Sequence, residues 1–163
     1  LGIQLSEHCS YKSSRKFLGT LPTKGENVIL GPAEDAGIVK VFEQDGENYC
    51  IAVGHESHNH PSQVVPYEGA ATGIGGIIRD IVCMGARPVG VLDSLRLGNP
   101  KNLEQRNIAS GVVEGIAGYG NPLGVPNLGG DVYFDDGFNE NCLVNVTAFG
   151  VLRESDLIHS YAP

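Results

Sequence analysis

Residues 47–61, ENYCIAVGHESHNHP, decide the fold, because a β-rich run leads directly into a cluster of polar side chains. The residues from Tyr49 to Val53 favour a strand. The seven residues from His55 to Pro61 include three of the chain's five histidines, together with a glutamate and a serine. We therefore expect a strand that starts in the interior of the domain and carries functional side chains at its end.

The segments on either side extend this pattern. Upstream, residues 36–53, AGIVKVFEQDGENYCIAV, predict a β-hairpin that turns at Asp45-Gly46. Downstream, apolar residues at helical spacing from Ile77 to Val82 predict a helix that ends at Gly85. Residues 89–97, VGVLDSLRL, predict the strand that follows this helix.

The second half of the chain completes the sheet. A second helix is predicted from Asn102 to Tyr119, with Asn102 and Gln105 at the spacing of a capping box. A glycine- and proline-rich loop over residues 120–130 leads to strands at 131–134 and 142–152. The order β-β-α-β-α-β-β predicts an α+β fold, a mixed β-sheet with helices on one face. We expect another domain or subunit to cover the other face.

The composition fits one soluble domain over residues 1–163. Apolar residues make up 41% and charged residues 18% of the chain, and the net charge of −8 argues against nucleic-acid binding. Residues 1–20 predict an N-terminal helical segment with Ser6 as its N-cap. Its basic residues, Lys12, Arg15 and Lys16, form either an anion contact or a solvated helix face.

The cysteines indicate a reducing environment. Cys9, Cys50, Cys83 and Cys142 are widely separated and form no C-x-x-C pair, so the chain lacks the spacing of a disulfide framework and of a zinc finger. We therefore expect a cytoplasmic protein, with Cys50, Cys83 and Cys142 in the core. No apolar stretch approaches the ~18 residues that a membrane span needs.

The histidine run is the first candidate site. Because side chains alternate along a strand and Pro61 favours extended geometry before it, one face would carry Glu56, His58 and His60 and the other His55, Ser57 and Asn59. The first face has the ligand types of a zinc site, and a histidine at a strand end suits acid–base chemistry. A polar strand edge without a task is the alternative, which three histidines and a carboxylate make less attractive.

Residues 69–80, GAATGIGGIIRD, are the second candidate. Glycines 73, 75 and 76 either leave free N–H groups at the start of a helix for a phosphate, or pack a helix tightly against the sheet. Arg79 and Asp80 are charged residues in an apolar helix, where such residues usually have a partner or ligand. Arg79 suits a phosphate, and Asp80 with Glu56 suits Mg²⁺ joined to substrate phosphates, which together describe an ATP-using enzyme.

Three motifs closely resemble the phosphoribosylformylglycinamidine synthase family, the formylglycinamide ribonucleotide amidotransferases of purine biosynthesis. They are SEHCSYKSS (6–14), ESHNHPSQVVPYEGAATGIGGIIRDI (56–81) and MGARPVGVLDSLRLG (84–98). The resemblance continues through residues 115–132, and the first two motifs are similar to those of the short bacterial and archaeal synthetase subunit. It implies the fold of the N-terminal domain of the aminoimidazole ribonucleotide synthase superfamily, which forms a barrel on dimerisation.

The resemblance also implies the chemistry. ATP would phosphorylate the formyl amide oxygen of formylglycinamide ribonucleotide, and ammonia would then displace phosphate to give the amidine. His8 and His58 match the active-site histidines, with His58 as the proton acceptor, and Tyr11 matches an ATP contact. The matching Mg²⁺ ligands are Glu56 and Asp80, and the matching substrate contacts are Ser57, His58, Asn59, His60 and Arg79.

The chain departs from the family at Gly54, where the family usually has a lysine that meets ATP. Either His55 takes over part of this contact, or other groups hold the nucleotide. Family synthetases are several times longer, so the resemblance covers only their first domain, and we expect this chain to be inactive alone. It further implies ammonia from a glutaminase subunit with a small accessory subunit, and a homodimer of the fragment through the open sheet face.

Two other functions stay open. One is a non-catalytic, structural nucleotide-binding domain of the same superfamily, and the other is a zinc-dependent hydrolase built on the histidine face. His8, Arg79 and the SHNHP run favour the catalytic reading, because a structural nucleotide needs phosphate ligands but no acid–base histidine.

Overall fold

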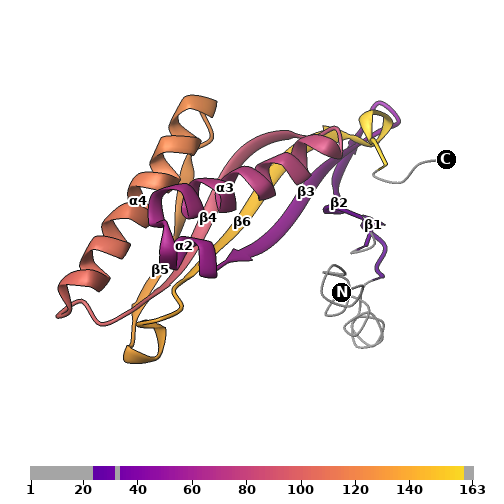
Figure 1. Ribbon diagram of the computed structural model, residues 1–163. Helices are drawn as coiled ribbons and strands as arrows, with labels where there is room; N and C mark the ends of the chain where they lie inside the picture. Colours follow the sequence, from indigo (N-terminus) through magenta and orange to yellow (C-terminus); the bar gives the residue numbers. More distant parts are fainter. Residues whose placement is uncertain (1–23, 32–33, 160–163) are drawn as a thin grey trace, which may run out of the picture.

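The computed structural model describes residues 24–31 and 34–159, which form a mixed six-stranded sheet with helices on one face (Figure 1). The strand order is β1-β2-β3-β6-β4-β5, in which only β4 and β5 are parallel neighbours. The strands are β1 (Val28–Leu30), β2 (Gly37–Gln44), β3 (Glu47–His58), β4 (Arg87–Leu97), β5 (Asn127–Phe134) and β6 (Leu143–Arg153). The predicted α+β class, with a mixed sheet, is confirmed.

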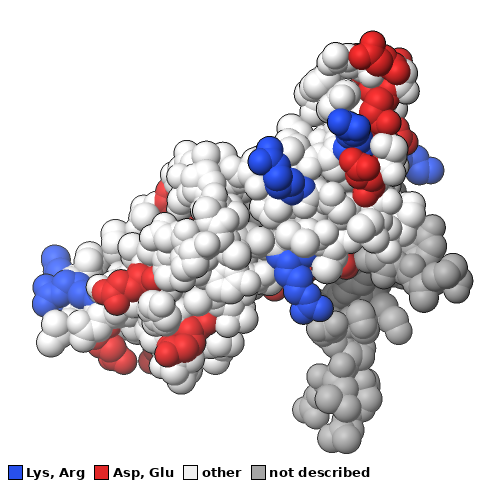
Figure 2. All heavy atoms as spheres, turned by 90° about the horizontal axis from the view of Figure 1, so that it is seen from above, with Lys and Arg blue, Asp and Glu red and all other residues white. Residues whose placement is uncertain are grey.

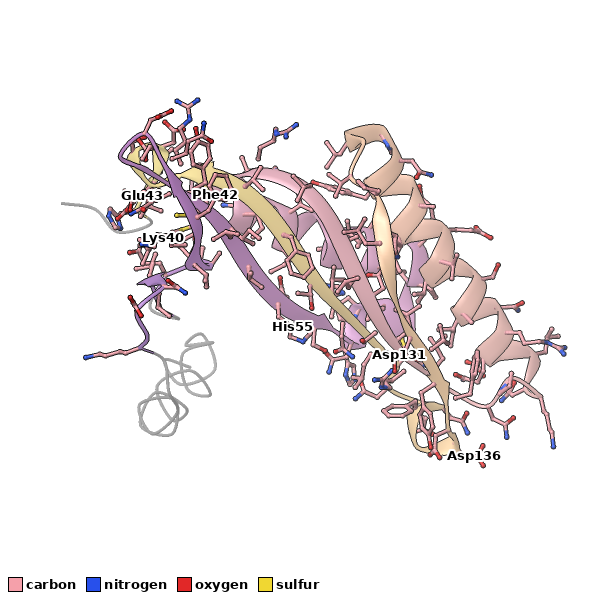
Figure 3. The ribbon with its side chains drawn as sticks, turned by 180° about the vertical axis from the view of Figure 1, so that it is seen from behind. Lys40, Phe42, Glu43, His55, Asp131 and Asp136 are labelled. Carbon is pink, nitrogen blue, oxygen red and sulfur yellow. The ribbon has the colours of Figure 1, made fainter. Side chains whose placement is uncertain are left out.

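Helices α2 (His60–Val64), α3 (Pro66–Cys83) and α4 (Leu103–Leu123) lie on the same side of the sheet, and Figure 3 shows the opposite, uncovered face. Short 3₁₀ turns, η1 (Asp136–Phe138) and η2 (Glu154–Asp156), precede and follow β6. Within the described residues, no helix is both long and apolar enough to cross a membrane.

Strand β3 lies at the centre of the sheet, between β2 and β6. Its even-numbered residues from Cys50 to Gly54 are buried beneath the helices, whereas Ile51 and Val53 on the uncovered face are only half-buried. In β6, residues 144, 146, 148 and 150 are buried in the same alternating way. This period of two is the signature of a sheet with one covered face.

Two glycines in the sheet allow α3 to approach closely. A Cβ atom at Gly54 would lie 2.7 Å from Cδ1 of Ile77, and a Cβ at Gly150 would overlap the side chain of Ile81. Both isoleucines are almost completely buried. At these two positions the sheet presents only backbone to α3. The isoleucine side chains of the helix therefore pack directly against the backbone of the sheet.

Glycines also set the contact between α3 and α4. The ring of Tyr119 occupies the space where a Cβ at Gly75 would lie, with its Cζ atom 2.7 Å from that position. On α4, a Cβ at Gly115 would overlap the backbone of Tyr67, and one at Gly118 would overlap its phenol. Of the two readings of glycines 73, 75 and 76, tight packing is therefore correct. They lie inside α3, so the predicted free N–H groups for a phosphate are absent there.

Several boundaries differ from the prediction. Helix α4 runs through Pro122 to Leu123 and ends at Gly124, which has a left-handed φ of 67°. Pro122 removes one backbone hydrogen bond from the last turn, and the helix ends one residue later at Leu123. Strand β5 then starts at Asn127, inside the segment predicted as a loop. Helix α2 was not predicted, because its five residues are too few to show a period.

Two smaller expectations were wrong in part. Asn102 caps α4 by accepting a hydrogen bond from the N–H of Glu104, but Gln105 does not complete the capping box. Its buried amide instead donates to the carbonyl of Asn139. Of the cysteines predicted in the core, Cys50 and Cys142 are buried, whereas Cys83 is exposed at the end of α3.

The packing of α4 on α3 predicts that a methyl group added at Gly115 lowers the stability of the domain. Gly115→Ala places a Cβ against the backbone of Tyr67, which cannot rotate away as a side chain can. We expect the free energy of unfolding to fall by about 1–3 kcal/mol, even though alanine favours a helix over glycine by about 1 kcal/mol. Denaturant unfolding followed by circular dichroism measures this change.

The matched control is Gly120→Ala in the same helix, where the nearest atom to a new Cβ is the carbonyl oxygen of Val125 at 3.4 Å. This ordinary contact lets the helix-forming tendency of alanine dominate, so its stability should equal or exceed that of the parent. Equal unfolding midpoints for Gly115→Ala and Gly120→Ala would show that the close helix contact is not a constraint.

Candidate functional site

The end of β3 holds His58 against α3 and α2. A Cβ at Gly73 would lie 3.0 Å from the Cβ of His58, so the imidazole is next to a part of the helix that lacks a side chain. The Nδ1 atom of His58 lies 3.0 Å from the hydroxyl oxygen of Ser62 in α2, and Ser62 is completely buried. This hydrogen bond fixes the ring through Nδ1 and leaves Nε2 as the nitrogen that can exchange a proton with a ligand.

Glu56 points to the same side of β3 and meets the next turn of α3. Its Oε2 atom is 3.1 Å from the position of a Cβ at Gly76. Asp80 follows one helical turn later and is half-buried. Burial, and then the negative charges of Asp35 and Glu56, raise the pKa of Asp80, while the guanidinium of Arg79 opposes the rise. Asp80 therefore lies in a negative environment that a cation would relieve.

These carboxylates suit Mg²⁺ bound together with a phosphate, but they do not form an all-protein metal cage. Across the described ranges, no group of three or more His, Cys, Asp and Glu side chains is arranged to hold a metal ion. Mg²⁺ typically uses one or two carboxylates and completes its shell with phosphate oxygens and water. Glu56 and Asp80 fit this requirement, because the Glu56 carboxylate meets α3 at Gly76 and its charge acts on Asp80 one turn further along the helix.

The predicted division of the histidine run is correct up to His58 and wrong after it. On the uncovered face, His55 Nδ1 lies 2.8 Å from the hydroxyl of Thr147 on β6 (Figure 3), and Ser57 faces the same side, opposite Asn145 in the register. His60 is not extended, however. It starts α2, with Pro61 in the first turn, where proline suits a helix.

The position of His60 rules out the predicted zinc site, which required three ligands on one face of a strand. The strand ends at His58, so His60 does not share a strand face with Glu56 and His58. Asn59 lies at the junction, where its carbonyl accepts the N–H of Gln63. The two faces of β3 therefore divide the motif, with Ser57 on the uncovered side and His58 on the helix side.

Arg79 lies apart from the histidine run. It is exposed on α3 and lines a groove to which none of residues 55–60 contributes. It does not share that cavity with Ser57, His58, Asn59 or His60 in this structure. His8 and Tyr11, with the N-terminal segment that carries them, lie outside the described residues.

Two residues that hold the turn after His58 in place, Ser62 and Gln63, were not predicted from the sequence. Ser62 follows His58 by four positions. The two side chains can meet only because the chain changes from strand to helix at Asn59, and this change was not predicted. Gln63 accepts the N–H of Cys142 and donates to the carbonyl of Asn139. It thereby ties α2 to the segment that leads into β6, and so supports the turn that carries His58.

A second polar cluster, outside this site, centres on Asp93 of β4. Asp93 is only 5% exposed, and its carboxyl accepts a hydrogen bond from the side-chain amide of Asn127. Its other oxygen, Oδ1, has no hydrogen-bond partner in the described part of the protein. Burial raises the pKa of Asp93 from an ordinary 3.8 to about 6. The carboxyl connects β4 to the first residue of β5.

Comparison with known proteins identifies relatives over the whole chain. The sequence profile of a family described as AIR synthase related protein, N-terminal domain, matches residues 33–152. The phosphoribosylformylglycinamidine synthase subunit PurL of Methanobrevibacter smithii is 54% identical over 163 residues, all of this chain and 22% of that protein. The chain therefore spans about a fifth of the length of this relative.

Two solved structures show the same architecture. Thermotoga maritima PurL complexed with ADP has a TM-score of 0.78 and 42% identity, over 99% of this chain and 25% of that one. Thermotoga maritima PurL complexed with FGAR has a TM-score of 0.75 and 43% identity, over 96% of this chain and 23% of that one.

The buried Asp93 predicts a pH dependence of stability. Between about pH 4 and pH 6 the unfolded chain has already lost this proton, while the folded protein still holds it. The contribution of Asp93 therefore lowers the free energy of unfolding as the pH rises through this window. The decrease reaches about 3 kcal/mol at neutral pH. Asp93→Asn removes the effect and keeps an oxygen that can accept from Asn127.

We expect Asp93→Asn to be similar in stability to the parent near pH 4 and more stable at pH 7. The difference between the two free energies of unfolding, measured in urea at each pH, isolates this group from the other carboxylates. Parallel stability curves from pH 4 to pH 7 would mean that Asp93 titrates normally.

Proposed function

The chain belongs to the family of AIR synthase related proteins and corresponds to their N-terminal domain, and on that basis we propose that it serves in ATP-dependent amidation of formylglycinamide ribonucleotide. It would form the N-terminal domain of a phosphoribosylformylglycinamidine synthase. The observation that carries this proposal is the placement of His58 and Glu56 against one helix, with Asp80 one turn beyond. One surface thus offers a proton-transfer group next to carboxylates for Mg²⁺.

The reaction needs both groups because it proceeds in two steps. The product is a formylglycinamidine and keeps the formyl group, so the oxygen that is replaced is the carbonyl oxygen of the glycinamide, not that of the formyl amide. This glycinamide oxygen attacks the γ-phosphorus of ATP, and ADP leaves, which makes the oxygen part of a good leaving group. Ammonia then adds to the same carbon, and loss of a proton and of phosphate gives the amidine. Mg²⁺, when bound, would neutralise the phosphate charges. Proton removal is the step that a histidine near neutral pH performs well.

Each predicted residue has a role in this scheme. Glu56 and Asp80 would hold Mg²⁺, and His58, positioned through Nδ1 by Ser62, would accept the proton at Nε2. Ser57, His58, Asn59, His60 and Arg79 would contact the ribonucleotide. Because these groups occupy both faces of β3 and the outer side of α3, substrate and nucleotide would extend around the end of the strand. His8 and Tyr11 would add the second histidine and an ATP contact.

Gly54 stands where the family usually has a lysine that meets ATP, and its packing shows that no side chain fits there without displacing a neighbour. It lies directly beneath Ile77 of α3, where any side chain would meet the isoleucine. His55, its neighbour, faces the uncovered side of the sheet and bonds to Thr147. An ATP contact from His55 would therefore come from the face opposite Glu56, so we propose that groups elsewhere hold the nucleotide near the carboxylates.

The relatives support further partners. Thermotoga maritima PurL has been crystallised with FGAR and with ADP, which supports the ribonucleotide and the nucleotide as ligands here. We propose that ammonia comes from a glutaminase subunit aided by a small accessory subunit, in the cytoplasm. The uncovered sheet face, with Val41 56% and Phe42 50% exposed, would pair with a second copy of this chain.

The role of His58 predicts a large kinetic effect. In the longer protein of which this chain would be the N-terminal domain, His58→Ala should lower ammonium-dependent ADP formation from Mg·ATP and formylglycinamide ribonucleotide by roughly 10²-fold or more. The control is Arg106→Ala, because Arg106 is an exposed residue near the start of α4 and has none of the proposed roles. Equal rates for His58→Ala and the parent would assign the proton acceptor to another group.

If the uncovered faces of two copies pair, the chain should form a dimer. A single negative charge introduced into this face should then disrupt the dimer. Val41 lines a depression on this face together with Ile51 and Val151, so Val41→Glu would bury a carboxylate in the interface. Sedimentation at roughly 50 μM, where weak association becomes measurable, should show a dimer for the parent and a monomer for Val41→Glu. Val113→Glu, at the same 56% exposure on α4, should stay dimeric. A monomeric parent contradicts the pairing.

A further inference from the structure

An open pocket of about 360 Å³ lies between α4 and the edge strand β5. Its volume is within the range of small-molecule sites. None of the residues assigned to the candidate functional site lines it. The lining residues are Asp93 and Leu95 of β4, Val113 and Ile116 of α4, and Asn127 with residues 129–132 of β5.

Asp93 gives this pocket a buried negative charge that the protein leaves partly unpaired. The residue is 5% exposed, and its Oδ2 atom accepts a hydrogen bond from the side-chain amide of Asn127. Its Oδ1 atom has no hydrogen-bond partner in the described part of the chain. Because burial raises the pKa of Asp93 only to about 6, the carboxyl is mostly ionised at neutral pH. A positive group in the pocket would offset the cost of burying this charge.

Strand β5 is bent where it passes Asp93. Leu128 is an extra residue of β5 between two consecutive pairs of the register with β4. The side-chain oxygen of Asn127 closes this bulge by accepting the N–H of Gly129 at 2.9 Å. A Cβ at Gly130 would overlap the backbone carbonyl of Asp93, so only glycine fits opposite this residue. Bulges and glycines inside strands are common where a strand meets a ligand.

No cation of the protein itself compensates Asp93. None of the described residues that line the pocket is a lysine, an arginine or a histidine. The second carboxylate at the pocket, Asp131, is exposed and already forms an ion pair with Arg96 at 3.0 Å. Lys and Arg side chains also stand apart on the face in Figure 2, so no broad basic patch on that face would repel a cation. The pocket therefore suits a positive group from outside the domain.

The other lining residues favour an organic ammonium group over a metal ion. A metal ion needs several oxygen ligands, and across the described ranges no group of three or more His, Cys, Asp and Glu side chains could hold one. Most of the remaining side chains around Asp93 are apolar instead. They suit an alkyl chain that ends in a charge, as the side chain of lysine does. These apolar residues are Leu95, Val113, Ile116 and Val132.

We propose that this pocket binds a primary alkylammonium group, with the charge on the carboxylate of Asp93 and the alkyl chain against the apolar walls. A free aliphatic amine and the lysine side chain of another protein segment share this chemistry. The proposal is independent of the proposed function, because no residue assigned to the amidation lines the pocket.

The first test is a titration of the purified chain with n-butylammonium chloride, followed by the NMR shifts of the Gly129 and Gly130 amides. We expect a Kd on the order of 1 mM, which is reasonable for so small a ligand. Asp93→Asn should raise the Kd about tenfold or more, because it removes the charge and keeps an oxygen that can accept from Asn127. An unchanged Kd in Asp93→Asn would overturn the proposal.

Glu114→Gln is the matched control for this titration. Glu114 is an exposed carboxylate of α4 next to Val113, but it does not line the pocket. The variant loses the same unit of charge as Asp93→Asn, so it should bind n-butylammonium as the parent does. An equal loss of binding in both variants would show a general effect of net charge and would overturn the proposal.

Three further ligands identify the chemistry that is recognised. Potassium chloride that displaces n-butylammonium at an equal concentration would indicate a metal site, and n-butanol that binds as tightly would indicate an apolar pocket, so either result overturns the proposal. The amide of Nα-acetyl-lysine tests the source of the ammonium group. Tighter binding of this compound than of n-butylammonium supports a lysine side chain, and weaker binding supports a free amine. Binding of neither amine overturns the proposal.

An ammonium group attached to the protein gives a test without added ligand. Val132 lines the pocket and is 55% exposed, so Val132→Lys should place its charge within reach of Asp93. This substitution should raise the melting temperature in the parent but not in Asp93→Asn, and should weaken n-butylammonium binding. Tyr133→Lys, also at 55% exposure in β5 but outside the pocket, should have neither effect. Equal changes for Val132→Lys in both backgrounds would contradict an ammonium site at Asp93.

Discussion

The close approach of α3 to its neighbours is the constraint on which the rest of the domain depends. Gly54 and Gly150 leave no side chains between the sheet and the isoleucines of α3, and Gly115 lets α4 rest on the backbone of Tyr67. Buried side chains at these positions would move the helices outward and open gaps in the core. The abundance of glycine in this sequence therefore reflects packing distance more than flexibility.

The same close packing brings the side chains of the candidate site together between β3 and α3. Gly73 and Gly76 present bare helix where His58 and Glu56 reach from β3, so both side chains lie between strand and helix without being displaced. Ser62 and Gln63 then fix the turn after the strand by hydrogen bonds to His58, Asn139 and Cys142. A helix with ordinary side chains at 73 and 76 would have to move away, and it would separate from His58 and Glu56.

Much of this fold could be predicted from the sequence, because its main strands and helices are long enough to show a period. The alternation predicted from His55 to His58 separated the two faces of β3 correctly, and the spacing of Ile77 and Ile81 identified α3. The residue types of Glu56, Asp80 and Arg79 indicated an Mg²⁺–phosphate site, and the motif resemblance added His8 and Tyr11.

The remainder depended on tertiary contacts that no local pattern encodes. The glycines of α3 looked equally like a phosphate loop, and only the facing side chains of β3 and α4 decide between the two. His60 was placed on a strand because proline is compatible both with an extended neighbour and with a first helical turn. The hydrogen bond between Asp93 and Asn127 joins segments far apart in the chain, so this buried contact could not be predicted from one stretch of sequence.

The most direct test is an experimental structure of the longer protein with ATP, formylglycinamide ribonucleotide and Mn²⁺ in place of Mg²⁺, because anomalous scattering locates manganese without ambiguity. We expect a manganese ion bound by Glu56 and Asp80 and by phosphate oxygens of ATP, with the glycinamide amide of the substrate within hydrogen-bonding reach of His58 Nε2. Manganese and nucleotide bound elsewhere, with Glu56 and Asp80 free of metal and His58 distant from the amide, would contradict a catalytic site between β3 and α3.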